Sequence, residues 1–370
     1  MKGRVLTRGW GFFLLSLCLL LCACGPQLGG YPYSELNTHE QRVFNGFSFL
    51  KQERLGDAQR EFDEALMLQP KSSAAYRGMG LVYGLKGDFG RAFEAMAMAS
   101  DYAEKNMDRA RAEVGMMSLY GMDRKEGWLL RVERSFEKTL SLSGEIPEAY
   151  LELGLAYKRA YRTRDAEEAF GKVLKLNATL LNEAREELDL LRKIEKAAPR
   201  SAIGKELTLL RRITRAETAA LLAQESPIEQ ILGASSKQML DSGIPPDVMN
   251  HRFKEEILLV LRLNIQGLGI LHDGSYGADH LMTRGVFARV MADVLVRGTG
   301  HEELTTRYLR THSPFRDVRN TSPHFSAIMI CFDWAGIMGG WEGYFHPMET
   351  ISAVDALLVL RGAESKLKGN

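Results

Sequence analysis

The stretch GFSFLKQERLGDAQREFDEALMLQP, residues 46–70, is repeated in outline 34 positions later as GLVYGLKGDFGRAFEAMAMA, residues 80–99. A small side chain lets two helices approach to about 8–10 Å, and a larger one fills the space between one helix pair and the next. The pattern therefore predicts antiparallel helix pairs that stack along the chain. The matching positions are Gly46, Phe49, Ala58, Phe62 and Ala65 in the first stretch, and Gly80, Tyr83, Ala92, Met96 and Ala99 in the second.

The same offsets recur as Gly154, Tyr157, Ala166, Phe170 and Val173. A less regular unit with about six additional residues lies between, and its second helix is expected to hold Trp128, Phe136 and Leu140. Four units are predicted, over 39–72, 73–106, 113–146 and 147–180. The pattern resembles the tetratricopeptide repeat (TPR), which implies an all-α solenoid over residues 38–198. An apolar stripe predicts a capping helix at its end, with Asp189 and Lys193 paired outside; the stripe consists of Leu181, Ala184, Leu188 and Leu191.

In TPR proteins the first helices line a concave groove that binds a protein partner. Val43 and Phe47 stand where chaperone-binding members carry Lys and Asn, so the sequence does not predict their clamp for a C-terminal carboxylate. Each charged candidate could also simply face solvent. Carried over by position, the resemblance implies a groove lined by Phe47, Lys51, Arg77, Leu81, Leu155, Lys158 and Arg159.

Residues 1–23 have the pattern of a signal peptide, because three basic residues precede a 14-residue apolar run from Trp10 to Ala23. A membrane span needs about 20 residues, although an uncleaved helical anchor remains the alternative. The run ends in Leu-Cys-Ala-Cys-Gly, which resembles a bacterial lipobox and implies lipidation of Cys24. Residues 24–37 are rich in Pro and Gly and predict a flexible tether. The resemblance implies attachment to the cell envelope, with Gly25 favouring the outer membrane, facing the periplasm.

Three further helix starts are predicted at Thr214, Thr283 and Ser352, each a favourable N-cap residue and each 69 positions from the next. Before the third lie Phe-Arg-Asp-Val at 315–318 and Tyr-Phe-His-Pro at 344–347. This order resembles the S-layer homology (SLH) repeat, which implies a second helical domain, a three-repeat spindle, over 199–361, followed by a tail over 362–370. The family's binding of acidic wall polysaccharide would be carried here by Arg215, Arg284, Asp317 and Trp341.

Two features weaken this implied polysaccharide site. The third motif has Ala353 where the first two have arginine, so one binding pocket is expected to be lost. Either arginine could instead hold a neighbouring carboxylate or carbonyl group, because arginines at helix starts often do so.

Composition excludes several classes of function. The chain has 48 basic and 47 acidic residues, and this balance gives no field that would gather nucleic acid. Three of the four cysteines lie in the first 24 residues, so Cys331 is expected to be a buried apolar residue rather than part of a disulfide or metal site. Seven of the eight histidines lie between His251 and His346 without metal-ligand spacing, and no phosphate loop or nucleophile elbow occurs. The sequence therefore predicts no catalytic residue, no metal and no cofactor.

Together these patterns predict an envelope lipoprotein that acts as a protein-interaction scaffold, with an SLH-like module for wall or surface polysaccharide. The alternative is an accessory lipoprotein for outer-membrane, pilus or secretion assembly that binds no carbohydrate. A third possibility is a wall hydrolase with an unrecognised site.

Overall fold

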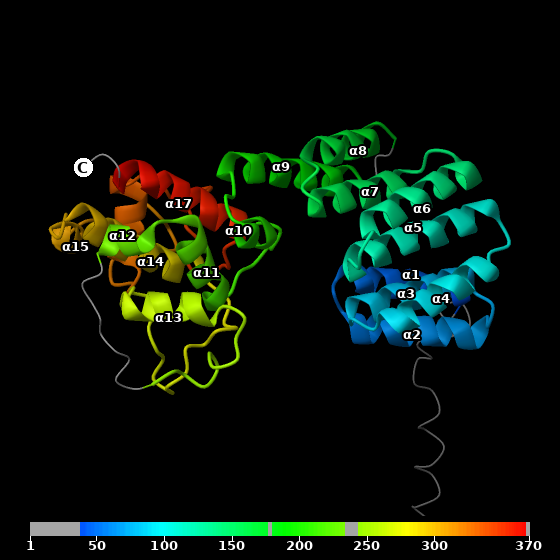
Figure 1. The fold of residues 1–370 in the computed structure, drawn as a ribbon, viewed down its shortest axis with the longest axis horizontal. Helices are drawn as coiled ribbons and strands as arrows, with labels where there is room; N and C mark the ends of the chain where they lie inside the picture. Colours follow the sequence, from blue (N-terminus) through cyan, green and yellow to red (C-terminus); the bar gives the residue numbers. More distant parts are fainter. Residues whose placement is uncertain (1–37, 177–179, 234–242, 368–370) are drawn as a thin grey trace, which may run out of the picture. The chain divides into compact units, whose positions relative to one another are not determined.

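The structure, a computed structural model, describes residues 38–176, 180–233 and 243–367. These residues form helices and three isolated β-bridges but no β-strand, so the all-α prediction is confirmed (Figure 1). The chain divides into two compact units, residues 1–156 and 157–370. The predicted signal peptide, the lipidation site Cys24 and the tether over 24–37 lie outside the described residues.

The first unit is a TPR-like stack of helix hairpins, in which α1 packs against α2, α3 against α4 and α5 against α6. Each hairpin also packs against the next one along the chain, as the repeat pattern predicts. The helices are α1 (His39–Lys51), α2 (Leu55–Leu68), α3 (Ser73–Leu85), α4 (Phe89–Asp101), α5 (Asn106–Asp123), α6 (Trp128–Ser143) and the first part of α7 (Pro147–Arg159).

Phe62 is the residue around which the first two hairpins pack. Its side chain is fully buried, and its ring lies against two glycines, Gly46 of its own hairpin and Gly78 of the next. A Cβ atom added to Gly46 would lie 2.4 Å from the ring, and one added to Gly78 would lie 2.2 Å from it. The repeat continues with Met96, which lies against Gly115 of α5 in the same way. The Phe62 ring therefore fits only because Gly46 and Gly78 have no side chain.

The third hairpin differs from its predicted bounds. The sequence predicts a start at residue 113 after about six additional residues, but α5 begins at Asn106 and runs for 18 residues. The segment from Asn106 to Val114 contains neither Gly nor Pro, so nothing stops the helix and the additional residues extend it.

The second unit begins with the end of α7 and contains eleven further helical segments among the described residues. These are α8 (Thr163–Leu176), α9 (Leu181–Ala197), α10 (Ala202–Leu207), α11 (Arg215–Glu225), α12 (Ile228–Leu232), α13 (Lys254–Arg262), α14 (Arg284–Thr299), α15 (Leu304–Arg307), α16 (Phe325–Met329) continued by the π-helix η1 (Ile330–Trp334), and α17 (Ala353–Leu367).

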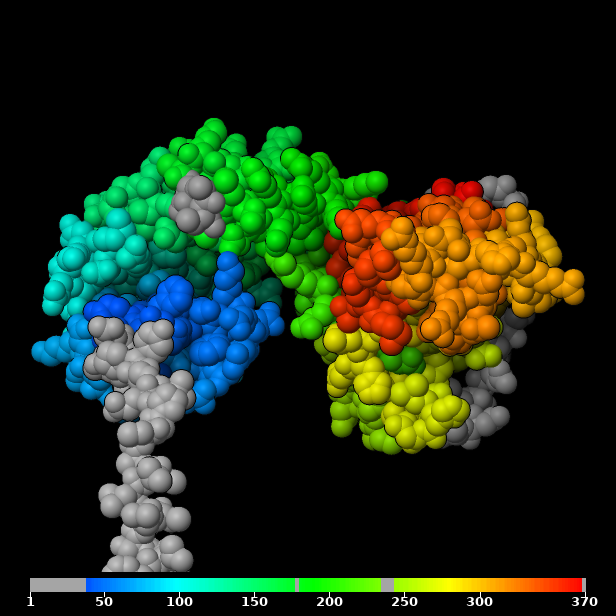
Figure 2. Space-filling model, turned by 180° about the vertical axis from the view of Figure 1, so that it is seen from behind, coloured from blue at the N-terminus to red at the C-terminus, as the bar shows by residue number. Residues whose placement is uncertain are grey.

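A closed ring of backbone hydrogen bonds organises this unit. The N–H of Ile213 donates to the carbonyl of Ile351 at 3.2 Å, that of Ile351 to Met282 at 3.1 Å, and that of Met282 to Ile213 at 2.7 Å. Each of these residues precedes one of the predicted N-caps, so the 69-residue spacing becomes an approximate threefold arrangement. Figure 2 shows the result from behind, with the segment near residues 250–280 (yellow) lying against the C-terminal segment (orange and red).

All three predicted N-caps are confirmed. The hydroxyl oxygens of Thr214, Thr283 and Ser352 each accept a hydrogen bond from a backbone N–H three residues later, at 3.2, 3.3 and 3.1 Å. Helices α11, α14 and α17 therefore begin where the sequence predicts.

The predicted domain boundary at 198/199 is corrected by the helix packing. Helix α11 packs against α13, α14 packs against α16, and α17 packs against α9. Helix α9 therefore completes the threefold set, although it also packs against α8 as the predicted capping helix would. The sequence does not predict that α9 packs against α17, because the 69-residue period can be recognised only at the starts of α11, α14 and α17.

One smaller prediction is wrong, and the bounds of the last helix add a detail. Lys193 does not pair with Asp189; its Nζ lies 2.8 Å from Asp355 of α17, and Asp189 pairs with Arg192 instead. The predicted tail over 362–370 is helical as far as Leu367, because Ala363 is buried and Leu367 packs near Gly298. By contrast, Cys331 is fully buried as expected.

None of the helices in the described ranges combines the length and the apolar character needed to cross a membrane.

Replacing Gly78 with Ala tests the glycine contact of Phe62. We expect Gly78→Ala to destabilise the first unit by about 1–3 kcal/mol, since the ring is enclosed by Gly46 on its other side and cannot move away. The control is Gly56→Ala on α2, where an added Cβ would meet nothing within 4 Å and Ala should be neutral or stabilising by up to about 1 kcal/mol. Urea denaturation followed by circular dichroism measures both. Equal shifts in the two variants would contradict the assignment.

Candidate functional site

The first helices of the hairpins form one surface of the first unit. Helix α1 packs against α3, and α3 against α5, whereas the second helices have fewer contacts with one another. In a curved stack of hairpins, the more closely packed helices lie on the inner side. We call this surface the first-helix face; its candidate binding residues are Phe44, Phe47, Arg77, Leu81 and Leu85.

Arg77 and Phe47, which the sequence places in the groove, are brought together by the structure. The guanidinium carbon of Arg77 lies 4.5 Å from the centre of the Phe47 ring, and that ring meets Phe62 edge-on at 5.0 Å. Arg77 is the only charged residue of α3. Burial of its guanidinium and the nearby positive charge of Arg111 lower the pKa of Arg77 to about 10. The site therefore combines a partly desolvated cation with an aromatic ring.

The remaining groove candidates of the first unit lie on α3, α7 and α1. Leu81 is half-buried on α3, one turn beyond Arg77, and Leu155 is half-buried on α7. Lys51 is exposed at the last position of α1. The exposed apolar residues Phe44 and Leu85, which sequence reasoning missed, extend the surface, since 69% and 49% of their areas are accessible.

Lys158 and Arg159 belong to the second unit and have other surroundings. Lys158 is buried and forms an ion pair with Glu187 of α9, which also accepts from Arg211 at 3.2 Å. Burial lowers the pKa of Lys158, although the Glu187 carboxylate favours its charged form. The Lys158 ammonium therefore joins α7 to α9 and is not a surface charge for a partner. Arg159 is half-buried at the end of α7.

Arg215 is committed to holding a loop within the second unit. Its Nε donates to the carbonyl of Tyr276 at 2.9 Å, and its two terminal nitrogens donate to Gly267 at 2.7 Å and Gly269 at 2.6 Å. The side chain is 8% exposed and stacks over the Tyr276 ring. Asp247 holds the same loop from the other side by accepting from the N–H groups of Tyr276 and Ala278, both at 2.9 Å.

Arg284 and Asp317 repeat this arrangement on the next loop. Arg284 donates to the carbonyls of Phe345 at 2.9 Å and Gly339 at 2.7 Å. The two carboxylate oxygens of Asp317 accept from the N–H groups of Phe345 and His346, at 2.9 and 2.7 Å. The alternative role noted for these arginines, a clamp on backbone carbonyls, is therefore the one that the geometry provides.

An arginine that sequence reasoning missed joins the ends of α9 and α11. Arg361, two turns after Ala353 on α17, donates to the carbonyls of Ala197 at 3.0 Å and Glu225 at 2.8 Å. It also pairs with the fully buried carboxylate of Glu225, which accepts from the Ser201 hydroxyl at 2.6 Å. Burial alone would raise the pKa of Glu225, but these hydrogen bonds together hold it below its usual value.

Trp341, the remaining predicted polysaccharide contact, has 47% of its area exposed. Its ring stacks on His346 at 4.2 Å, and Arg284 lies 4.9 Å from its centre. A tight turn from Trp341 to Tyr344 presents the ring, with Glu342 and Gly343 both at positive φ. The turn therefore places the ring at the surface, in contact with His346 and Arg284.

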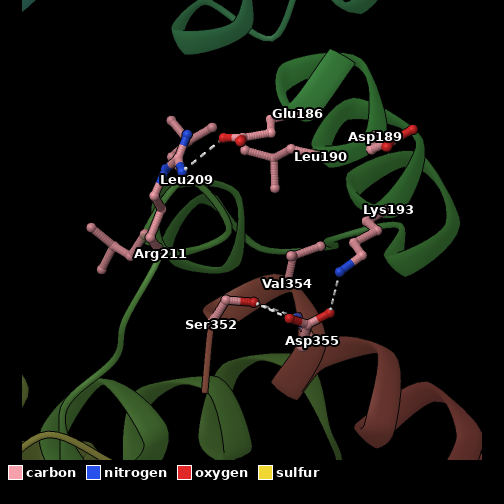
Figure 3. Close-up of a pocket in the computed structure, with 10 residues that line it drawn as sticks. Glu186, Asp189, Leu190, Lys193, Leu209, Arg211, Ser352, Val354 and Asp355 are labelled. Atoms are coloured by element: carbon pink, nitrogen blue, oxygen red, sulfur yellow. Dashed lines mark hydrogen bonds and ion pairs between the residues drawn. The ribbon is translucent and has the colours of Figure 1, made fainter. Parts of the chain in front are cut away.

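A recess of about 340 Å³ lies between α9, the segment before α11 and the first turn of α17 (Figure 3). Leu190 and Val354 point into it, while the pairs Lys193–Asp355 and Arg211–Glu186 stand at its sides. Both cations are already paired with carboxylates. These contacts join α9 to its neighbours, and the recess offers no free charge to a ligand. In the described residues, no group of three or more His, Cys, Asp or Glu side chains is arranged to hold a metal ion.

Comparison with known proteins identifies no family for this chain. No protein-family model and no curated protein matches it. A solved structure from Pseudomonas aeruginosa, described as the functional characterization of pilF, is similar at 19% sequence identity with a TM-score of 0.30. The match covers 50% of this chain and 83% of the other. A likeness at this distance supports no argument about function, so the function must be argued from this chain's own residues.

The clamp formed by Arg215 predicts a loss of stability when its planar fork is removed. We expect Arg215→Lys to destabilise the second unit by about 2–3 kcal/mol, because an ammonium group cannot reach three separated carbonyls. Arg212→Lys, at an exposed neighbouring position, should leave stability unchanged. Urea denaturation of the two variants checks this. If the Arg215→Lys variant is as stable as the wild type, the structural role is wrong.

The Glu225 network predicts an acid-sensitive contribution to folding. Since the pKa of Glu225 is lower in the folded state, its contribution is present above pH of about 4.5 and is lost as pH falls through the folded value. Glu225→Gln should therefore be less stable than the wild type at pH 7, by about 1–3 kcal/mol, and the difference should shrink below pH of about 4. Thermal unfolding from pH 3 to 7 measures it, with exposed Glu229→Gln as control. A pH-independent difference would argue against the network.

Proposed function

We propose that this chain is a non-catalytic scaffold whose first-helix face recruits another protein. The observation that carries the proposal is the Arg77–Phe47 pair with exposed apolar residues on the same helices. Interaction sites on proteins characteristically combine aromatic residues and arginine in a partly desolvated centre. Stacked hairpins present such a surface without having to change shape, since each hairpin is held by its neighbours.

The two exposed apolar side chains support a macromolecular partner over a small ligand. Phe44 lies one turn before Phe47 on α1, and Leu85 lies two turns after Arg77 on α3. Both side chains would add apolar area to the contact that a macromolecular partner makes with the Arg77–Phe47 pair. A partner that covers Phe44 and Leu85 would also cover the guanidinium group of Arg77.

Anchoring at the cell envelope is part of the same proposal. Its support is the sequence alone: the signal-peptide pattern, the lipobox ending at Cys24 and the Pro- and Gly-rich tether that follows. Lipidation at Cys24 would hold the scaffold at a membrane surface, with the outer membrane facing the periplasm as the proposed place.

For the second unit, we favour the accessory role without carbohydrate binding. The guanidinium groups of Arg215 and Arg284 are directed at backbone carbonyls, and both carboxylate oxygens of Asp317 accept backbone hydrogen bonds. Of the four residues proposed for polysaccharide, these three bond to backbone groups of the second unit, and the fourth, Trp341, is 47% exposed and already contacts His346 and Arg284. In this role the second unit assists envelope assembly by binding other components, and it does not hydrolyse the cell wall.

A paired set of charge insertions tests the scaffold role. Phe44→Glu combined with Leu85→Glu should reduce recovery of partner proteins from detergent-solubilised envelope by about tenfold or more, because each buried apolar contact at a binding centre contributes more than about 1 kcal/mol. The matched control is Met67→Glu with Met98→Glu, which changes comparably exposed apolar residues on the second helices. Quantitative mass spectrometry of the captured proteins gives the comparison.

Identical losses with both double variants would count against the first-helix face. Sedimentation with purified peptidoglycan sacculi is the second arm: the full chain should stay in the supernatant and release no soluble fragments. Binding to sacculi that Trp341→Ala abolishes would favour the polysaccharide role over the accessory one, and fragment release would favour a wall hydrolase.

A further inference from the structure

Arg77 has a charge without a carboxylate partner. In the described part of the chain, no carboxylate lies within ion-pair distance of its guanidinium, and the group that faces it is the ring of Phe47. The carboxylates of Glu148 and Asp108 favour its charged form only from a longer distance, and Arg111, of the same sign, opposes it. Partly desolvated cations in proteins are ordinarily paired, because losing water costs several kcal/mol that a ring alone does not offset. The partner of Arg77 is therefore to be sought outside the chain.

The ring also fixes which side of the guanidinium is open. The guanidinium carbon of Arg77 lies over the Phe47 ring, 4.5 Å from its centre, so the ring covers one side of the group and leaves N–H donors along the edge of the planar fork for a partner. A carboxylate is the group that best fits this edge, because it accepts two parallel hydrogen bonds in the same plane. A second cation or an amide would not offset the free energy that the Arg77 guanidinium loses when water is removed from it.

The spacing along α3 indicates what accompanies the carboxylate. Arg77, Leu81 and Leu85 are four residues apart, so they lie in one row on the helix, about 6 Å from one to the next. An extended chain advances about 6.6 Å for every two residues. An acidic side chain and two apolar side chains at alternate positions of an extended peptide would thus meet the three residues in register. The apolar row favours a peptide over a phosphate group, which would leave both leucines uncovered.

We propose that the first-helix face binds an extended segment of its partner in which an acidic residue pairs with Arg77 and apolar residues two and four positions away contact Leu81 and Leu85. This proposal rests on the scaffold role and names the chemistry of the partner. It differs from a clamp for a C-terminal carboxylate, since an internal Asp or Glu side chain suffices.

Fluorescence anisotropy with synthetic peptides tests the motif on the full chain. The probes are labelled peptides with Asp-Ser-Leu-Ser-Leu in both chain directions, versions with Asn in place of Asp, and versions with the leucines moved to adjacent positions. We expect at least about tenfold weaker binding when Asp is replaced by Asn or when the leucine spacing is changed. Arg77→Gln should abolish the preference for Asp over Asn, whereas Arg60→Gln, an exposed arginine of α2, should leave it intact.

A charge reversal keeps the test valid if Arg77→Gln alters folding. Arg77→Glu should bind the peptide with Lys in place of Asp better than the Asp peptide, a preference that a misfolded protein could not acquire. Equal binding of Asp and Asn peptides by the wild type, or no binding of any peptide, overturns the proposed motif. Neither result bears on the scaffold role, which the Phe44 and Leu85 variants decide separately.

Discussion

The stacking of the first unit depends on the absence of side chains at a few positions. Phe62 occupies a space bounded by Gly46 and Gly78, and any Cβ at either position would overlap its ring. This close approach brings α1 and α3 together, and with them the ring of Phe47 and the guanidinium of Arg77. The candidate site is therefore a direct consequence of the packing, because Phe47 rests on Phe62 and Arg77 rests on Phe47.

In the second unit, long loops connect short helices and must be held in place by other contacts. Its ring of three backbone hydrogen bonds fixes the starts of α11, α14 and α17. Arg215 and Arg284 then each hold one loop by donating to its carbonyls. Arg361 donates in the same way to carbonyls at the ends of α9 and α11. Loop carbonyls lie at irregular spacings, and a planar group with several donors reaches them better than any other side chain.

The sequence predicts the parts of the structure in which a residue type repeats at a fixed interval. Gly46 and Phe62 indicate the helix hairpins, and Thr214, Thr283 and Ser352 indicate three helix starts. It does not reveal contacts made once, such as Arg361 with Glu225 or Lys158 with Glu187, because such pairs leave no period. Asp247 could have been found, since an Asp-Val pair occurs there and again at 317–318. Arg215 keeps the position of the family motif, while its donors bond to the carbonyls of the loop.

The arginines of this chain differ in what their guanidinium groups contact. Arg215, Arg284 and Arg361 are each partly or fully buried, and each donates to carbonyl or carboxylate oxygens of its own unit. Arg77 is desolvated as well, yet an aromatic ring is what faces it. Folding gains little from such a group, because its charge loses water without an anion in return. We infer from this partly desolvated cation that an anionic group of a partner pairs with Arg77 at the first-helix face.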